Sequence, residues 1–358
     1  MNFPGAKGML YTIPKKESKT ERGKRMLRYI GKRLLMLIPV LLAISLLVLV
    51  IIDLTPGDPA RILLGTQATE EQVQELRDEM GLNDPFFVRW WNYITGIITR
   101  GDFGTSMMTK RPVVTEMLER FNYTLLLVIF GTVFSVLVGI PVGIYAATHV
   151  HTWKDSLAIF LSLIAISMPS FWFALLIIRF FGVRLQWLPI SGIDNWKGWI
   201  MPCVSMALGT IAMLARQMRS DMLETLRQDY ITTARAKGLP ERKVVYRHAL
   251  KNALIPVITI VGGMFGASLG GSLITEVIFS VPGMGQYVMT GLNNRDYPVI
   301  QSGILILSAL FSIIILIVDI LYALVDPRIR SQYGSRKSKR KGKNDDEHKE
   351  DKEKVAVA

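Results

Sequence analysis

The sequence predicts an all-α membrane protein with six transmembrane helices, because of its long uncharged runs and the placement of its basic residues. Half of the 358 residues are hydrophobic, and they collect in runs that contain no Asp, Glu, Lys or Arg. A helix of about 18 apolar residues is long enough to cross a hydrocarbon core of roughly 30 Å. The six runs are residues 34–52, 121–148, 156–178, 199–215, 253–275 and 297–318.

The first run follows a basic segment, residues 1–33, so a signal peptide is the alternative reading. Its 19 uncharged residues exceed the usual apolar length of a signal peptide, and no small-residue cleavage site follows. We therefore expect a permanent first transmembrane helix over residues 34–54.

Residues 55–120 are expected to form an extracytoplasmic helical insertion after this first helix. Thr69 is a candidate N-cap, followed by acidic residues that suit the start of a helix, and Gly81 can end that helix. A second helical stretch begins near Phe86 and carries several aromatic residues. This stretch lies either along the outer membrane surface or as a cap on the membrane helices.

The remaining five runs form the predicted permease domain, residues 121–326. The fourth run, 199–215, is the weakest because it contains Pro202 and Gly209. Without it, the very basic segments that follow the fourth and sixth runs would fall on opposite sides of the membrane. We therefore count six helices.

Basic residues set the expected orientation, since cytoplasmic segments retain Lys and Arg. With both termini in the cytoplasm, the inner segments carry 30 Lys or Arg and the outer segments carry 10. The inner segments are 1–33, 148–155, 217–253 and 326–358, and the outer segments are 55–120, 183–198 and 279–298. The tail, residues 327–358, is expected to be disordered and cytoplasmic because it is charged and almost free of large apolar residues.

The net charge of +13 predicts contact with membrane lipid and no nucleic-acid partner, because the basic residues flank the apolar runs. Cys203 is the one cysteine, which excludes an internal disulfide and a multi-cysteine metal site. It is most simply a small packed residue. No cofactor and no metal site are predicted.

The inner segment 217–252 does not resemble a simple connector. Residues 229–237 are predicted to form a short helix, and Gly238 follows where a left-handed cap is expected. Pro240 suits the first position of another helix, which presents Val244, Val245 and His248 before it enters the membrane. Two short helices joined at a glycine make a protrusion that another protein can grip.

This segment resembles the EAA loop of permeases in binding-protein-dependent ABC importers. Of the general pattern, Glu-Ala-Ala, three residues, Gly, nine residues and Ile-x-Leu-Pro, the chain matches Ala234, Gly238 and Leu250. Thr233-Ala-Arg-Ala-Lys-Gly238 and His248-Ala-Leu-Lys-Asn-Ala-Leu-Ile-Pro256 are closer to the dipeptide, oligopeptide and nickel branch. Further stretches similar to that branch are Thr55-Pro-Gly-Asp-Pro59, Gly101-Asp-Phe-Gly-Thr-Ser106, Thr275-Glu276, Phe279-Ser-Val-Pro-Gly283 and Asp326-Pro-Arg328, so the resemblance covers roughly residues 26–330.

The resemblance implies that the loop docks into a groove of a cytoplasmic ATPase and transmits its closure to the membrane helices. The implied partners are a second, homologous permease subunit, two ATPase subunits and an extracytoplasmic substrate-binding protein, in a bacterial or archaeal cell membrane. ATP hydrolysis is expected on the separate subunits, and this chain has no Gly-x4-Gly-Lys-Ser/Thr phosphate loop. The implied coupling residues are Thr233, Ala234, Arg235, Ala236, Gly238, His248 and Leu250.

Membrane-embedded residues provide a second set of candidates. Gly262, Gly266 and Gly270 recur every four residues, so another helix of this chain or of the partner permease can approach closely there. Glu276 lies at the outer end of its run, where its side chain can snorkel to the membrane surface. Asp319 lies deeper and needs protein or water around it, with Arg216 or Arg219 as candidate partners.

Three functions remain open. An importer permease that translocates di- or oligopeptides is favoured, with nickel import by the same machinery as its rival. A stand-alone secondary transporter would be expected to show inverted repeats and buried ionisable residues along its path, and no repeat is convincing. A membrane enzyme would need a cluster of catalytic groups, which four His and one Cys do not provide.

Overall fold

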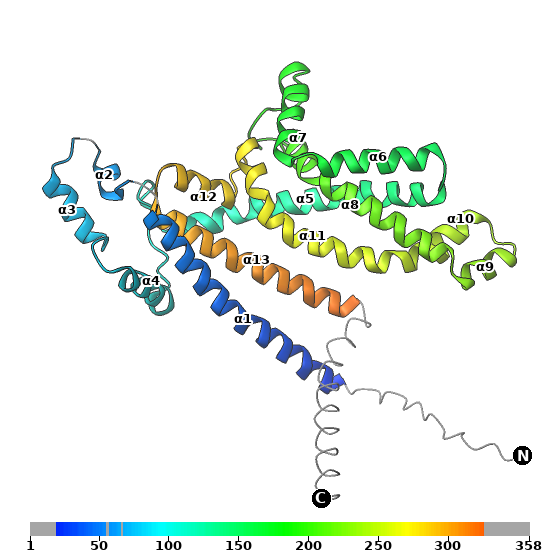
Figure 1. The fold of residues 1–358 in the computed structure, drawn as a ribbon, viewed down its shortest axis with the longest axis horizontal. Coiled ribbons are helices and arrows are strands. Elements are labelled where there is room, and N and C mark those ends of the chain that lie inside the picture. The colour runs from blue at the N-terminus through cyan, green and yellow to red at the C-terminus, as the bar shows by residue number, and fades with distance from the viewer. Residues whose placement is uncertain (1–18, 55–56, 66, 326–358) are drawn as a thin grey trace, which may run out of the picture.

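The computed structural model describes residues 19–54, 57–65 and 67–325, and this part of the chain folds into helices without a β-strand (Figure 1). The elements are α1 (Lys19–Leu54), α2 (Pro59–Leu64), α3 (Glu70–Glu79), α4 (Phe86–Arg100), α5 (Val113–Thr148), α6 (Trp153–Ser167), α7 (Ser170–Ile177), η1 (Ile178–Arg184), η2 (Trp196–Trp199), α8 (Ile200–Leu226), α9 (Asp229–Ala236), α10 (Glu241–Lys243), η3 (Val244–Ala249), α11 (Leu250–Phe279), α12 (Met284–Asn293) and α13 (Tyr297–Val325).

The described residues contain five helices that are long and apolar enough to cross a membrane, or six if one bent pair counts as a single span. The five are Ile30–Leu54, Val113–Thr148, Trp196–Leu226, Glu241–Phe279 and Tyr297–Val318. Each contains one of the predicted runs, so the all-α membrane fold is confirmed. The weak fourth run is part of a helix that continues well beyond it.

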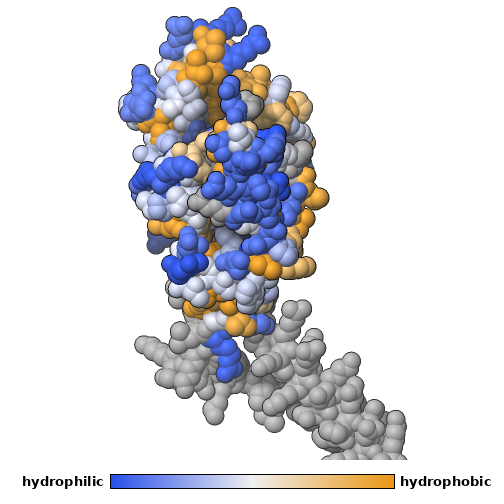
Figure 2. Space-filling view, turned by 90° about the vertical axis from the view of Figure 1, so that its left-hand side faces the viewer, coloured by the Kyte–Doolittle hydropathy of each residue, from blue (hydrophilic) through white to orange (hydrophobic). Residues whose placement is uncertain are grey.

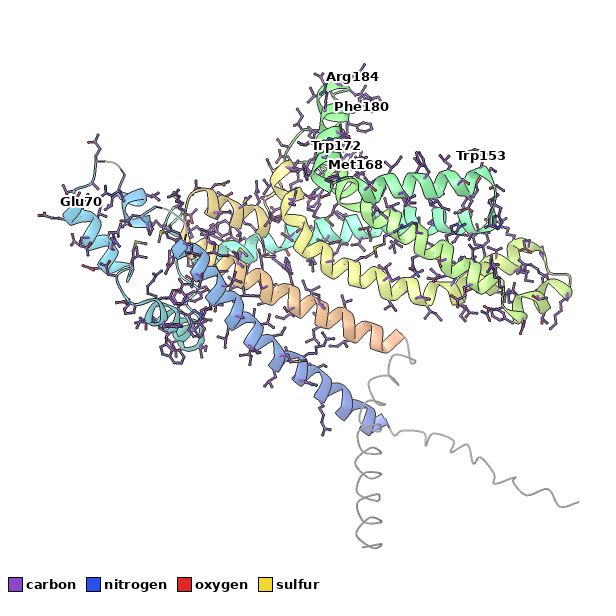
Figure 3. The ribbon with its side chains drawn as sticks, in the orientation of Figure 1. Glu70, Trp153, Met168, Trp172, Phe180 and Arg184 are labelled. Carbon is purple, nitrogen blue, oxygen red and sulfur yellow. The ribbon has the colours of Figure 1, made fainter. Side chains whose placement is uncertain are left out.

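The third predicted run, 156–178, is not one straight helix. It breaks near Pro169, and the two pieces, Trp153–Ser167 and Ser170–Arg184, meet at 102°. Proline lacks an N–H and pushes the residue before it out of the helical region, and Met168 accordingly has an extended backbone with φ −85° and ψ 122°. The second piece projects away from the bundle, with Trp172, Phe180 and Arg184 along it (Figure 3).

The centre of the bundle is the pair α5 and α8, which pack along each other with α11 beside them (Figure 1). Two glycines of α5 allow this close approach. A Cβ on Gly139 would lie 2.9 Å from the carbonyl oxygen of Ile211, and one on Gly143 would lie 2.5 Å from that of Ala215. Small residues therefore set the distance between these helices, as in other membrane bundles.

The predicted first helix, 34–54, is the apolar part of a longer helix, since α1 begins at Lys19. It packs beside α13 (Figure 1), through buried residues that include Val48, Ile52 and Ile300.

Helices α2 to α4 form the predicted helical insertion, with the predicted start and end for α3. Thr69 caps α3 through a capping box with Gln72, and Gly81 follows its end with φ +64°. Helix α4 is held against α1, because the Trp90 indole donates to Ser45 Oγ at 3.0 Å and Arg89 pairs with Asp53 at 2.8 Å.

The opposite face of α4 carries apolar side chains, since Phe87 and Trp91 are 70% and 61% exposed. Helix α4 therefore packs on a membrane helix, as the cap alternative expects, and keeps an exposed aromatic face; whether that face lies along the outer membrane surface stays a prediction. Figure 2 shows this end of the molecule, where hydrophilic residues cover much of the face and hydrophobic residues line its margin.

Candidate functional site: the loop between α8 and α11

The loop folds as two short helical elements around Gly238. Helix α9 ends at Ala236, and Gly238 adopts φ +76°, the predicted left-handed conformation. Pro240 is the N-cap of α10, whereas the sequence predicted it at the first helical position. The backbone N–H groups of Lys243 and Val244 both donate to the Pro240 carbonyl and close the first turn. A π-helical turn, η3, then joins α10 to α11 without a break, and such turns recur at functional sites.

One side of the loop is a hydrophobic anchor. Ile231 of α9 is fully buried and Ala234 nearly so, together with Val244, Val245 and Ala249. They pack against a hydrophobic cluster at this end of the bundle, the loop-end cluster, which contains Leu214, Met218 and Met222 of α8 and Ile144 and Ala147 of α5. This burial fixes the loop to α8 and α5, and the loop is therefore a rigid projection of the bundle.

The other side of the loop is exposed and basic. Across the Gly238 turn, Arg235 and Glu241 form an ion pair at 2.6 Å, which raises the pKa of the Arg235 guanidinium. The Asn252 amide donates to the Tyr230 hydroxyl at 2.7 Å and ties α9 to α11. Besides Arg235, the exposed cations near the turn are Lys237, Arg242, Lys243, Arg247 and Lys251.

The predicted coupling residues divide between these two sides. Thr233, Arg235, Ala236 and Gly238 are exposed, whereas Ala234 is buried. His248 and Leu250 are partly buried, and Leu250 packs against the loop-end cluster. One face of α9 and the turn are therefore exposed, and the second half of the motif attaches the loop to the bundle.

The glycines of α11 have different surroundings. A Cβ on Gly266 would lie 2.8 Å from Ile315 Cγ1, and one on Gly270 would lie 3.7 Å from Phe311. Both neighbours belong to α13, so these glycines lie where two helices of the same chain approach. Gly262 is partly buried one turn earlier on α11.

One expectation for a charged residue is wrong. Glu276 does not snorkel, because its side chain is completely buried. Arg219, one of the two candidate partners of Asp319, pairs with Asp155: its Nε and Nη2 lie 2.6 Å and 2.7 Å from the two carboxylate oxygens. The side chain of Asp319, in α13, lies outside the described residues.

The sequence analysis missed the polar contacts that join the helices. Asp296 accepts hydrogen bonds from Ser106 Oγ at 2.6 Å and Met108 N at 3.2 Å, which seats the Gly-Asp-Phe-Gly-Thr-Ser stretch against the turn between α12 and α13. Asp155 lies in the first turn of α6, 64 positions before Arg219. Partners so far apart in the sequence cannot be matched from the sequence alone. An acidic residue beside an apolar run with no basic residue near it in the sequence nevertheless indicates that a partner lies on another segment.

Long apolar helices that carry an anchored basic loop at one end define a multi-span membrane protein. The chain also matches two family models, "Binding-protein-dependent transport system inner membrane component" over residues 139–331 and its N-terminal domain over residues 26–128. The chain therefore belongs to this family of ABC importer permeases and is a multi-pass inner-membrane protein.

Curated relatives match along most of the chain. The glutathione transport system permease protein GsiC of Salmonella typhimurium is 43% identical over 305 residues, which cover 85% of this chain and 99% of the relative. The dipeptide transport system permease protein DppB of Alkalihalophilus pseudofirmus is 43% identical over 335 residues, covering 85% of this chain and all of the relative.

A solved structure shares the fold. The inward-facing MetNI methionine ABC transporter superposes with a TM-score of 0.50 at 19% identity, covering 60% of this chain and 97% of that chain.

Proposed function

We propose that this chain is the permease subunit through which an ATP-driven importer translocates di- or oligopeptides. It works with a second, homologous permease, two cytoplasmic ATPase subunits and an extracytoplasmic substrate-binding protein. Relatives named for glutathione and dipeptide transport, each 43% identical to this chain, support a peptide substrate over nickel.

The observation that carries the proposal is the construction of the loop. Its buried side is anchored on α5 and α8, its exposed side is basic, and its last turn continues directly into α11. A partner that moves α9 and the Gly238 turn therefore moves a membrane helix. An ATPase with an acidic groove is the partner that suits a projection with six exposed cations near its turn.

The proposed orientation places both termini and the loop 217–252 in the cytoplasm, with α2 to α4 outside. The threefold bias of Lys and Arg toward the inner segments supports it. In this orientation residues 1–33 and 327–358 are cytoplasmic segments, and residues 55–120 face the binding protein.

Single cysteines at Glu75 and Lys237, both exposed, test this orientation in a Cys203→Ser background. On intact cells, a membrane-impermeant thiol reagent is expected to label position 75 and to label position 237 only after the membrane is opened. Labelling at 237 and not at 75 on intact cells would reverse the orientation.

Reconstitution tests the function itself. Proteoliposomes with the complete assembly and the binding protein are expected to accumulate a labelled dipeptide or glutathione when ATP is supplied to the ATPase side, and this chain alone is expected to accumulate neither. Accumulation by this chain alone in an ion gradient would indicate a secondary transporter. Uptake of Ni²⁺ and of no peptide by the complete assembly would contradict the substrate assignment.

A further inference from the structure

A buried carboxylate joins three helices at the end of α11 that is remote from the loop. Glu276 is fully buried. Its Oε1 accepts a hydrogen bond from Thr124 Oγ1 of α5 at 2.8 Å, and its Oε2 accepts one from the backbone N–H of Gln286 in α12 at 3.0 Å. Ser272, one turn earlier on α11, lies 3.1 Å from Oε1. The carboxylate therefore holds one residue from each of α5 and α12.

Thr124 completes the attachment of α12. Its Oγ1 accepts the backbone N–H of Met284 at 2.9 Å while its hydroxyl donates to Glu276. Two N–H groups in the first turn of α12, which no helical carbonyl can satisfy, thus bond to this pair of side chains. The N-terminal end of a helix also favours an acidic side chain at this position.

The chain leaves room for the carboxylate with two glycines. A Cβ on Gly283 would lie 2.6 Å from Glu276 Oε1, and one on Gly285 would lie 3.0 Å from Oε2 and 2.8 Å from the Cα of Leu273. Any larger residue would displace the carboxylate or α12. The turn between α11 and α12 is therefore built around this side chain.

The same helix begins at the candidate docking loop. The helical segment Glu241–Phe279 comprises 39 residues, which at 1.5 Å per residue is about 58 Å. Helix α12 has a second attachment to α5, because the Arg120 guanidinium lies 4.5 Å above the Tyr287 ring. That contact attaches α12 to α5, whereas the attachment to α11 consists of the short turn 280–283, the close packing of Gly285 on Leu273 and the hydrogen bonds of Glu276.

We propose that Glu276 is a positioning residue that makes α12 move with α11. Displacement of the loop by the ATPase then reaches α12 at the far end of the same helix. This inference rests on the proposed function for the source of the displacement. The attachment itself is a property of this chain.

Spin labels at Ile274 of α11 and Thr290 of α12, both exposed, test the proposal in the complete importer in a Cys203→Ser background. With Glu276 present, we expect one narrow distance distribution that is the same without nucleotide and with ATP trapped. Glu276→Ala and the near-isosteric Thr124→Val should broaden it in both states. Glu276→Gln keeps one oxygen for the Gln286 N–H, so it should give an intermediate width.

Uptake provides the second readout. Losing a hydrogen bond to a buried charged group should lower peptide uptake per complex by about tenfold, while ATP hydrolysis continues. Val277→Ala, an exposed neighbour on α11, is the matched control and should change neither readout.

Unchanged distance distributions in both Glu276→Ala and Thr124→Val would overturn the proposal, and so would a wild-type distance that changes when ATP is trapped. Failure of the unmodified importer to take up peptide would instead contradict the proposed function. The two failures are distinguishable, because the distance measured without nucleotide does not depend on transport.

Discussion

Replacing Gly238 by valine is expected to abolish import while the chain reaches the membrane in normal amount. Gly238 has φ +76°, where an L side chain costs roughly 1–2 kcal/mol and a β-branched one costs more. A Cβ there meets no atom within 4 Å, so the strain is confined to the backbone of the turn. Relaxing it tilts α9 relative to α10 and displaces the exposed docking face.

A graded series of substitutions at Gly238 separates the effect of backbone strain from that of side-chain size. Asparagine tolerates the left-handed region, so Gly238→Asn should retain most import, Gly238→Ala should lose part of it and Gly238→Val should lose nearly all. The measurements are membrane amount, peptide uptake and co-purification of the ATPase. Normal uptake and normal ATPase retention with valine would remove the coupling role from this loop.

Replacing Arg219 by alanine is expected to produce the largest loss of stability among single changes in the polar contacts. Asp155 is 4% exposed and would remain buried without its cation. Breaking a buried ion pair costs about 3–5 kcal/mol, and the lower end applies because the Arg219 side chain is 24% exposed. The buried Cys203 reports the unfolding temperature in detergent when it reacts with a thiol-specific dye.

Two comparisons make this result specific. The double variant Asp155→Ala/Arg219→Ala should be more stable than Arg219→Ala, because no unpaired charge remains buried. Arg235→Ala removes an arginine from an ion pair that is exposed on both sides, so it should cost about 1 kcal/mol or less. Equal losses in Arg219→Ala and Arg235→Ala would show that the Asp155 contact does not hold α6 to α8.

Local patterns predicted most of the fold. Uncharged runs identified the membrane helices, because insertion strongly disfavours charges within them. Thr69 and Gly238 were correctly assigned as a helix cap and a left-handed turn, since both roles depend on a few adjacent residues. Pro169 was the missed local signal: its effect on Met168 divides the third run.

Contacts between distant segments were not predictable in the same way. The partners of Glu276 lie on α5 and α12, 152 positions before it in one case and 10 after it in the other. A charge at the end of an apolar run is compatible with snorkelling as well as with burial, and only the packing of α12 decides between them. The pairing of Arg219 with Asp155 was not predicted for the same reason.

The most direct test of the account is a photo-crosslinking amino acid at Ala236, which is exposed on α9 beside the Gly238 turn. In the complete importer, irradiation is expected to link this chain to the ATPase subunit. The same amino acid at Glu75 of α3 is expected to give no ATPase adduct. The account predicts that the loop between α8 and α11 couples the permease to ATP hydrolysis. An ATPase adduct from position 75 would contradict it. So would an adduct from position 236 with the substrate-binding protein in place of the ATPase.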